Sequence, residues 1–282
     1  MPLLRKRSMP AKQFFRISAL LVAAFSFVAI PVFAQQEQIA GLAARTADAI
    51  SKAHAKSIVV ADFWSPQNKL TKLGQALADQ FSAELLGLGK FKVLDRRCLH
   101  DVIEQNGLSP LALRDIDIAE WMAHESRAAV IILGNLESAN AQYKLAIGIY
   151  TVPKGKNLNN FGITMPAGPN WESLFQTPML GFASGPHEAG KDGYTTPRCV
   201  YCSNPTYSGA AFHEKLQGVV VLDAIIGPDG KAHDIIVAKK MGSGLDESAV
   251  KAAQSWRFQP AVGPDGKPAA VRMLFEMEFH LY

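Results

Sequence analysis

Two cysteines in this sequence have a spacing at which thiols can do chemistry. Cys199 and Cys202 form a C-x-x-C motif, which in an oxidising compartment can close a tight disulfide, and which can otherwise exchange electrons or bind metal. Ser203 follows the motif where covalent haem attachment requires histidine, and two cysteines alone make a poor zinc site. The spacing therefore predicts a structural disulfide that leaves Cys98 unpaired, with a redox-active pair as the alternative.

The other residue types that catalyse reactions or bind ligands form no recognisable motif. Residues 87–90, Gly-Leu-Gly-Lys, lack the Ser or Thr of a phosphate loop and close a helix instead of opening one. Asp115 and Asp117 are typical of charges at a helix start. No G-x-S-x-G motif occurs, and the histidines show no metal-ligand spacing: His54, His100, His124, His187, His213, His233 and His280. The sequence therefore predicts no catalytic residue, no metal ligand and no cofactor, and an enzyme is the alternative to a binding protein.

The first 34 residues have the three parts of a secretory signal peptide. A basic start precedes an apolar run over 17–30, and Val32, Phe33 and Ala34 provide the small or modest side chains that signal peptidase requires before Gln35. We expect cleavage after Ala34 and export to the periplasm. The alternative is an uncleaved anchor in the inner membrane, because residues 17–34 come close to the roughly 20 residues needed to span a bilayer.

The charge of the chain argues against nucleic acid as a partner. The formal net charge is +4 at pH 7, but five of the basic residues precede residue 35, where no acidic residue occurs. The remainder carries 24 Lys and Arg against 25 Asp and Glu. Because the body of the protein has no basic bias, it has no field that attracts phosphate.

Residues 57–152 alternate between apolar strands and amphipathic helices, which predicts an α/β layer domain. After a polar helix over 38–55, we expect strands at 57–63, 91–94, 129–133 and 143–149, and helices at 70–88, 97–105 and 116–127. The runs VVADFWSP, LGQALADQFSAELL, KFKVLDRRCLHDVIEQNGLS and AAVIILGNLE resemble the amino-terminal domain of TolB and the related FlgO and curli-assembly envelope proteins. The resemblance implies an envelope domain that binds proteins and has no catalytic site.

Residues 153–204 have the composition of a linker. The stretch 152–206 holds 7 Pro and 7 Gly in 55 positions, about the fraction at which aperiodic Pro and Gly indicate irregular structure. Its apolar side chains, among them Trp171 and Phe175, are too numerous for a purely solvated spacer. We therefore expect a linker of which a part packs on a domain.

The last 75 residues have the pattern of a small antiparallel sheet. A strand at 218–226 and a partner at 232–239 flank Gly-Pro-Asp-Gly, which suits a tight turn. A helix with apolar residues at helical spacing follows over 245–256. The sequence therefore predicts an α+β fold, in which the α/β layer domain is followed by a small antiparallel sheet with one helix packed across it. Trp256 and Phe258 are expected to pin that helix to the sheet.

This carboxy-terminal stretch resembles the carboxy-terminal domain of the TonB energy-transducer family. The matching residues occur in the family's order: Pro205, Tyr207, Gly218, Gly230, Gly244, Leu245, Asp246, Trp256, Phe258 and Pro260. The resemblance implies a periplasmic domain, here 205–282, that grips TonB-dependent outer-membrane transporters through a short extended segment of the transporter. It also implies that this contact carries force to the transporter from an inner-membrane, proton-driven complex.

The final strand is the predicted docking edge for such a segment. An edge strand with unpaired N–H and C=O groups accepts an added strand. Apolar side chains fall on one parity of this strand and Arg272, Glu276 and Glu278 on the other, with Leu274 as the exception. The predicted partner-binding residues are Val271, Arg272, Met273, Leu274, Phe275, Glu276, Met277, Glu278, Phe279 and His280. The alternative is an edge covered by a second copy of the chain, as in a homodimer, or by the linker.

Two features of the TonB family are missing from the sequence. Residues 17–34 contain no histidine, whereas the anchor helix of the family usually carries a Ser and His pair. The prolines are too few for a rigid rod, and a flexible coil of this length spans about 40 Å against about 170 Å for a polyproline rod. A non-energised envelope adaptor that holds two protein partners is therefore the alternative to an energy transducer.

Overall fold

The computed structural model describes residues 18–66, 69–140, 142–178 and 187–281, and over 18–34 it describes the backbone alone. Helix α1 (Ser18–Lys52) begins earlier than the helix expected over 38–55. Apart from that backbone, the predicted signal peptide or anchor, residues 1–34, lies outside the described residues. None of the helices in the described ranges is both long enough and apolar enough to cross a lipid bilayer.

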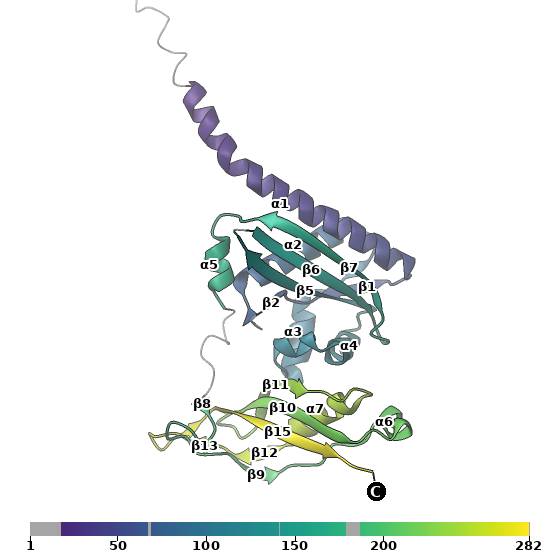
Figure 1. Cartoon of the computed structure of the whole chain (residues 1–282), viewed down its shortest axis with the longest axis vertical. Helices are drawn as coiled ribbons and strands as arrows, with labels where there is room; N and C mark the ends of the chain where they lie inside the picture. The colour runs from purple at the N-terminus through teal and green to yellow at the C-terminus, as the bar shows by residue number, and fades with distance from the viewer. Residues whose placement is uncertain (1–17, 67–68, 141, 179–186, 282) are drawn as a thin grey trace, which may run out of the picture.

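A seven-stranded mixed sheet forms the centre of the amino-terminal part of the molecule (Figure 1). β1 lies between β4 and β5 and pairs with both in parallel, whereas β5, β6 and β7 form an antiparallel meander. β6 pairs with β5 along its whole length, so the short strand β2 pairs with Asn135 on the side of β5 that β1 also uses, and β3 pairs with β2. The seven strands are β1 (Ser57–Val60), β2 (Trp64–Ser65), β3 (Lys69–Leu70), β4 (Lys92–Val93), β5 (Val130–Ala139), β6 (Gln142–Thr151) and β7 (Asn157–Pro166).

Helices cover both faces of this sheet. Successive residues of a strand point to opposite faces, so an apolar strand such as β1 gives both faces apolar side chains that helices can bury. Ile58 and Val60 of β1 pack in one apolar core with α1 and α2, whereas Val59 packs in a second core with α3 and α4. Asp115 caps α4 by accepting a hydrogen bond from the N–H of Asp117 at 2.9 Å, so both acids belong to a helix start, as expected. The helices are α2 (Lys72–Gly87), α3 (Arg96–Gln105), the 3₁₀ turn η1 (Pro110–Arg114) and α4 (Ile116–Glu125).

The linker predicted for residues 153–204 is wrong over its first half. β7 pairs with β6 along almost its whole length, and Met165 of β7 is fully buried beneath α1 and α2. Helix α5 (Trp171–Gln176) follows, and the ring of Phe175 packs edge-on against Tyr143 with 5.5 Å between the ring centroids. Pro153 and Pro166 lie at the two ends of this strand region, where proline costs few sheet hydrogen bonds.

The carboxy-terminal part contains a four-stranded sheet in the order β11-β10-β15-β8. The hairpin of β10 (Gly218–Ile226) and β11 (Ala232–Lys239) and the helix α7 (Leu245–Ser255) lie where the sequence predicts them. Helix α7 packs across the sheet, which together with the amino-terminal layer confirms the predicted α+β fold class. The remaining elements are β8 (His187–Glu188), β9 (Arg198–Tyr201), α6 (Gly209–Glu214), β12 (Arg257–Gln259), β13 (Ala261–Val262), β14 (Pro268–Ala269) and β15 (Val271–Phe279).

The two parts pack directly against each other, with α3, η1 and α4 on one side and β11 and α7 on the other (Figure 1). Leu108 lies in the same apolar core as Ile235 and Val250. The backbone of Ile235 bonds across the interface in both directions, accepting from Ser109 at 3.1 Å and donating to Gly107 at 2.9 Å. The outer edge of β11 is therefore occupied at its middle by the amino-terminal part.

Candidate functional site

The predicted docking residues lie in one strand of the carboxy-terminal sheet. β15 holds Val271 to Phe279, and His280 follows directly after its end. On one side, β15 pairs with β10 in an unbroken antiparallel register from Val271 to Phe279. On the other side, β8 pairs in parallel with Val271 and Arg272. In the part of the chain that the structure describes, no strand pairs with this outer side from residue 273 onward, and we call the outer side of 273–279 the open edge.

A hydrogen bond from the residue that follows β8 shows which backbone groups of β15 face the open edge. The carbonyl of Arg272 accepts a bond from the N–H of Ala189 at 3.0 Å, so the backbone groups of Arg272 point away from β10. Because backbone direction alternates along a strand, Leu274, Glu276 and Glu278 also point their N–H and C=O groups outward. The residues between them bond to β10. Three residues of the open edge therefore present paired donors and acceptors to an incoming strand.

The side chains of β15 alternate between the core and solvent. Val271, Met277 and Phe279 are buried, Met277 and Phe279 in the same core as α7, and Met273 and Phe275 are half-buried against that core. The opposite parity is exposed, and it includes Leu274, which keeps 62% of its surface in contact with solvent. The alternation matches the pattern in the sequence, and the exposed Leu274 adds an apolar contact to a face that is otherwise charged.

Aromatic side chains support the open edge from below. The ring of Phe275 lies 5.2 Å from Trp256 and 5.5 Å from Phe258, and these two rings contact each other edge-on at 6.0 Å. Near the other end of the strand, Tyr207 packs edge-on against Phe279 at 5.5 Å and donates a hydrogen bond to the carbonyl of Leu216. Trp256, Phe258 and Tyr207 thus fix the position of the strand that carries the open edge.

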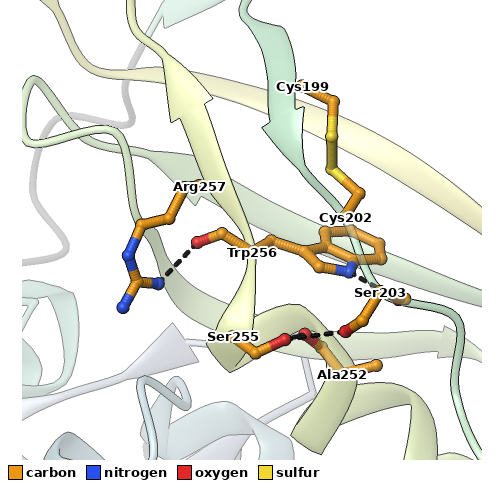
Figure 2. Close-up of a disulfide and its surroundings, with 7 residues drawn as sticks. All are labelled: Cys199, Cys202, Ser203, Ala252, Ser255, Trp256 and Arg257. Carbon is orange, nitrogen blue, oxygen red and sulfur yellow. Dashed lines mark hydrogen bonds between the residues drawn. A yellow bond between two sulfur atoms is a disulfide. The ribbon is translucent and has the colours of Figure 1, made fainter.

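The disulfide lies beside this aromatic group. Cys199 is bonded to Cys202, and the indole N–H of Trp256 donates to the carbonyl of Ser203 at 2.9 Å, as Figure 2 shows. β9, which contains Cys199, pairs with β12, and β12 contains Phe258. Cys98 is free and exposed on α3. The disulfide therefore constrains residues 199–202 themselves, and the pairing of β9 with β12 and the hydrogen bond from Trp256 join this segment to the aromatic group.

The other motif residues shape the turns and the helix start. Gly230 has a φ of +72°, and a Cβ there would lie 2.2 Å from the carbonyl oxygen of Phe258, so only glycine fits. Gly244 precedes α7 with a φ of +80°, and Leu245 is fully buried. Asp246 is also fully buried, and its carboxylate accepts hydrogen bonds from the N–H groups of residues 241 and 242. Gly218 opens β10 opposite Phe279, Pro205 precedes Tyr207, and Pro260 separates β12 from β13.

Acidic side chains meet where α4 and α7 begin. Burial raises the pKa of Glu247, and the nearby carboxylates of Asp117, Asp246 and Asp115 raise it further. Burial also raises the pKa of Asp117, and Asp115 adds to that rise. Lys240 lies 3.4 Å from Asp115 at the edge of the group. The contact between the two parts of the molecule therefore contains two carboxyl groups whose pKa is raised by burial and by neighbouring carboxylates.

Sequence reasoning missed a buried charged group in the amino-terminal part. Asp62, two residues after the end of β1, accepts a hydrogen bond from Arg96 at 2.9 Å and lies 2.7 Å from the Nε2 atom of His100. Arg96 also contacts Asp79 of α2. The group fastens α3 to the sheet and to α2. An acidic residue at the end of an apolar strand was its one signal in the sequence.

The residues of the carboxy-terminal part define a small α+β domain with one open sheet edge, a class that can accept an added strand. The family model of the Gram-negative bacterial TonB protein C-terminal matches residues 203–281. These residues therefore form a TonB C-terminal domain.

Solved structures also match parts of the chain. The TonB C-terminal domain of Pseudomonas aeruginosa is 22% identical, and the match covers 35% of this chain and 99% of that one, with a TM-score of 0.27. The C-terminal domain of LpoB from Salmonella enterica is 17% identical over 39% of this chain and 82% of that one, with a TM-score of 0.35. Lipoprotein GNA1162 from Neisseria meningitidis is 15% identical over 40% and 82%, with a TM-score of 0.34. No curated protein matches. The resemblance of 57–152 to TolB and FlgO stays a prediction.

Proposed function

We propose that this protein binds TonB-dependent outer-membrane transporters by strand addition at β15 and takes part in energy-coupled transport across the outer membrane. The observation that carries the proposal is the open edge of a TonB C-terminal domain, where Leu274, Glu276 and Glu278 point their backbone groups outward. A transporter segment in extended form would satisfy those groups, and its affinity would come mainly from backbone hydrogen bonds.

The packing of the two parts supports β15 as the docking strand. A four-stranded sheet has two edges, and among the described residues the β11 edge bonds to residues 107–109 of the amino-terminal part. The β8 strand closes only the first two positions of β15. The remaining edge is long enough for the five- to six-residue strand that is usual in proteins.

The disulfide supports an exported protein. Disulfides form and persist in oxidising compartments such as the periplasm, and Cys199 and Cys202 are bonded to each other. We place the domain in the periplasm, with residues 1–34 as a cleaved signal peptide or as an inner-membrane anchor. The domain boundaries that go with this placement are an envelope-binding domain that extends from residue 57 through β7 and α5, and the TonB C-terminal domain at 205–282.

Proline substitution tests the docking strand without removing any bond inside the sheet. The N–H of Leu274 or Glu276 points outward, so Leu274→Pro or Glu276→Pro removes a donor that β10 does not use. We expect each variant to weaken binding of a transporter's amino-terminal peptide at least tenfold, about 1.4 kcal/mol. Leu274→Ala and Glu276→Ala keep the N–H and serve as matched controls.

The measurement is the dissociation constant of the labelled peptide by fluorescence anisotropy, with a thermal melt of each variant to show that the fold persists. Proline variants that melt like the wild type and bind as tightly as the alanine controls would overturn the assignment of β15. Dimers seen by light scattering in the absence of peptide, and lost in the proline variants, would assign the open edge to a second copy of the chain.

A non-energised envelope adaptor is the second candidate, and the shared core favours it. Leu108 and Ile235 pack together where the two parts meet, so a single apolar core joins the part that carries the open edge to the part that carries the amino-terminal sheet. An adaptor would hold one partner on each part, whereas a transducer additionally needs an inner-membrane, proton-driven complex. Co-purification of that complex with the full chain from a cross-linked envelope would support the transducer. A proton uncoupler separates the two candidates, because it should stop transport that depends on a transducer and leave partner binding by an adaptor unchanged.

A further inference from the structure

We propose that the segment that docks on β15 carries basic side chains beside Glu276 and Glu278 and an apolar side chain beside Leu274. This inference rests on the proposed function, because it needs an added strand at the open edge. It assigns the chemical class of that strand, an alternating basic and apolar peptide, from the side chains that the edge already presents.

The charged side chains lie on the face that an added strand would share. Glu276 and Glu278 are exposed and stand on the same parity as Leu274, and side chains of one parity share one face of a sheet. Side chains on neighbouring strands approach to about 5 Å, so each position of the added strand on that face meets one of these residues. Acidic residues there would meet like charges, and basic residues would meet opposite ones.

The one Arg and the one Lys within β10, β11 and β15 are already engaged or lie too far away. Arg272 forms an ion pair with Asp223 of β10 at 3.4 Å, and its own edge position is paired with Glu188 of β8. Lys239 of β11 lies opposite Val221, which lies opposite Glu276, so it is separated from an added strand by three strand spacings. At about 4.8 Å each, this is about 14 Å and exceeds the Debye length at physiological salt.

His280 is the one described partner of these carboxylates. Its ring lies 3.1 Å from Glu278, and both side chains are more than half exposed. It does not contact Glu276. The two glutamates therefore give the far half of the open edge an acidic face, whereas the near half offers exposed Leu274.

The buried side of the added strand has a second requirement. Met273 and Phe275 are half-buried on the side of the aromatic group, so part of their apolar surface faces the position of an added strand. Side chains of the added strand that point inward would contact this surface. The expected docking sequence thus alternates between residues that face inward and residues on the outer face. The inward residues are apolar. On the outer face, a basic residue lies beside Glu278, a second basic residue beside Glu276 and an apolar residue beside Leu274.

A pair of synthetic peptides tests the proposal. Both are ten-residue peptides of alternating Val and Thr, and two successive Thr positions on one face are replaced by Lys in the first peptide and by Glu in the second. Cross-strand ion pairs contribute roughly 0.2–1 kcal/mol each, so we expect the wild-type protein to bind the Lys peptide about tenfold more tightly than the Glu peptide in 50 mM salt. The double variant Glu276→Lys with Glu278→Lys should reverse that order, and Glu276→Gln with Glu278→Gln should abolish it.

Leu274→Pro separates failure of this inference from failure of the proposed function. If it blocks both peptides while the charge variants leave their ratio unchanged, docking at β15 stands and the basic partner is wrong. If both peptides bind Leu274→Pro as tightly as the wild-type protein, the docking strand itself is wrong. A preference for Lys that the double Lys variant reverses, and that shrinks in 500 mM salt, supports the inference.

Discussion

Replacement of Asp246 by alanine should destabilise the carboxy-terminal domain by about 3–4 kcal/mol. The Asp246 side chain is fully buried in the first turn of α7. One carboxylate oxygen accepts from the N–H of Met241 at 2.9 Å, and the other accepts from the N–H of Gly242 at 3.0 Å. Its negative charge also lies at the amino-terminal end of the helix, where the helix dipole favours it.

The magnitude follows from the two donors that alanine leaves behind. A buried donor without a partner costs about 1–3 kcal/mol, so two such donors cost about 3–4 kcal/mol when partial relaxation is allowed. Asp246→Asn keeps one acceptor oxygen but turns an amide N–H toward the second backbone donor. We therefore expect Asp246→Asn to cost about half as much as Asp246→Ala.

Urea unfolding at pH 7.5 measures both free energies of unfolding. Domains of this size are stable by roughly 5–15 kcal/mol, so the variants should fold and unfold at lower urea concentrations. A cost below about 1 kcal/mol for Asp246→Ala would refute the view that the carboxylate is the partner of these donors. Equal costs for the Asn and Ala variants would refute the assignment of separate bonds to the two oxygens.

Three further changes test the packing around the candidate site. Because burial first, and Asp117 next, raise the pKa of Glu247, the folded protein binds a proton more readily than the unfolded chain, and the free energy of unfolding should rise as the pH falls through the raised pKa. Glu247→Gln should therefore be more stable than the wild type at pH 7.5 by about 1 kcal/mol, and the two urea midpoints should converge toward acidic pH; a constant difference would contradict this. Trp256→Ala removes the ring that contacts Phe275 and should cost about 3–5 kcal/mol by thermal or urea unfolding, with a cost below 1 kcal/mol ruling out a central packing role. Asp62→Ala leaves Arg96 without its buried partner and should cost about 3 kcal/mol, part of which Asp62→Ala with Arg96→Met should restore.

The carboxy-terminal hairpin, α7 and the alternation of β15 could be predicted because their signals are local. The Gly-Pro-Asp-Gly turn precedes a partner strand, and the parity of Met273 to Phe279 matches the burial that the structure shows. Gly230 needs a positive φ and a close approach to Phe258, so its residue type already marks the turn.

The parts that could not be predicted depend on which segments meet in space. β7 was expected to be linker because residues 152–206 are rich in Pro and Gly, and its pairing with β6 is visible only once the meander forms. The bond of Leu108 and its neighbours to Ile235 joins segments more than 100 residues apart, and no local pattern marks it. β8 is two residues long and carries no strand signal, yet its pairing with Val271 and Arg272 defines where the open edge begins.

Amide hydrogen exchange of β15 tests the central claim most directly. In the free protein, the amides of Met273, Phe275 and Met277, which bond to β10, should exchange slowly, and those of Leu274, Glu276 and Glu278 should exchange quickly. Saturation with a transporter's amino-terminal peptide should slow the second set and leave the first unchanged. Protection that does not change at Leu274, Glu276 and Glu278 while the peptide is bound would contradict strand addition at the open edge.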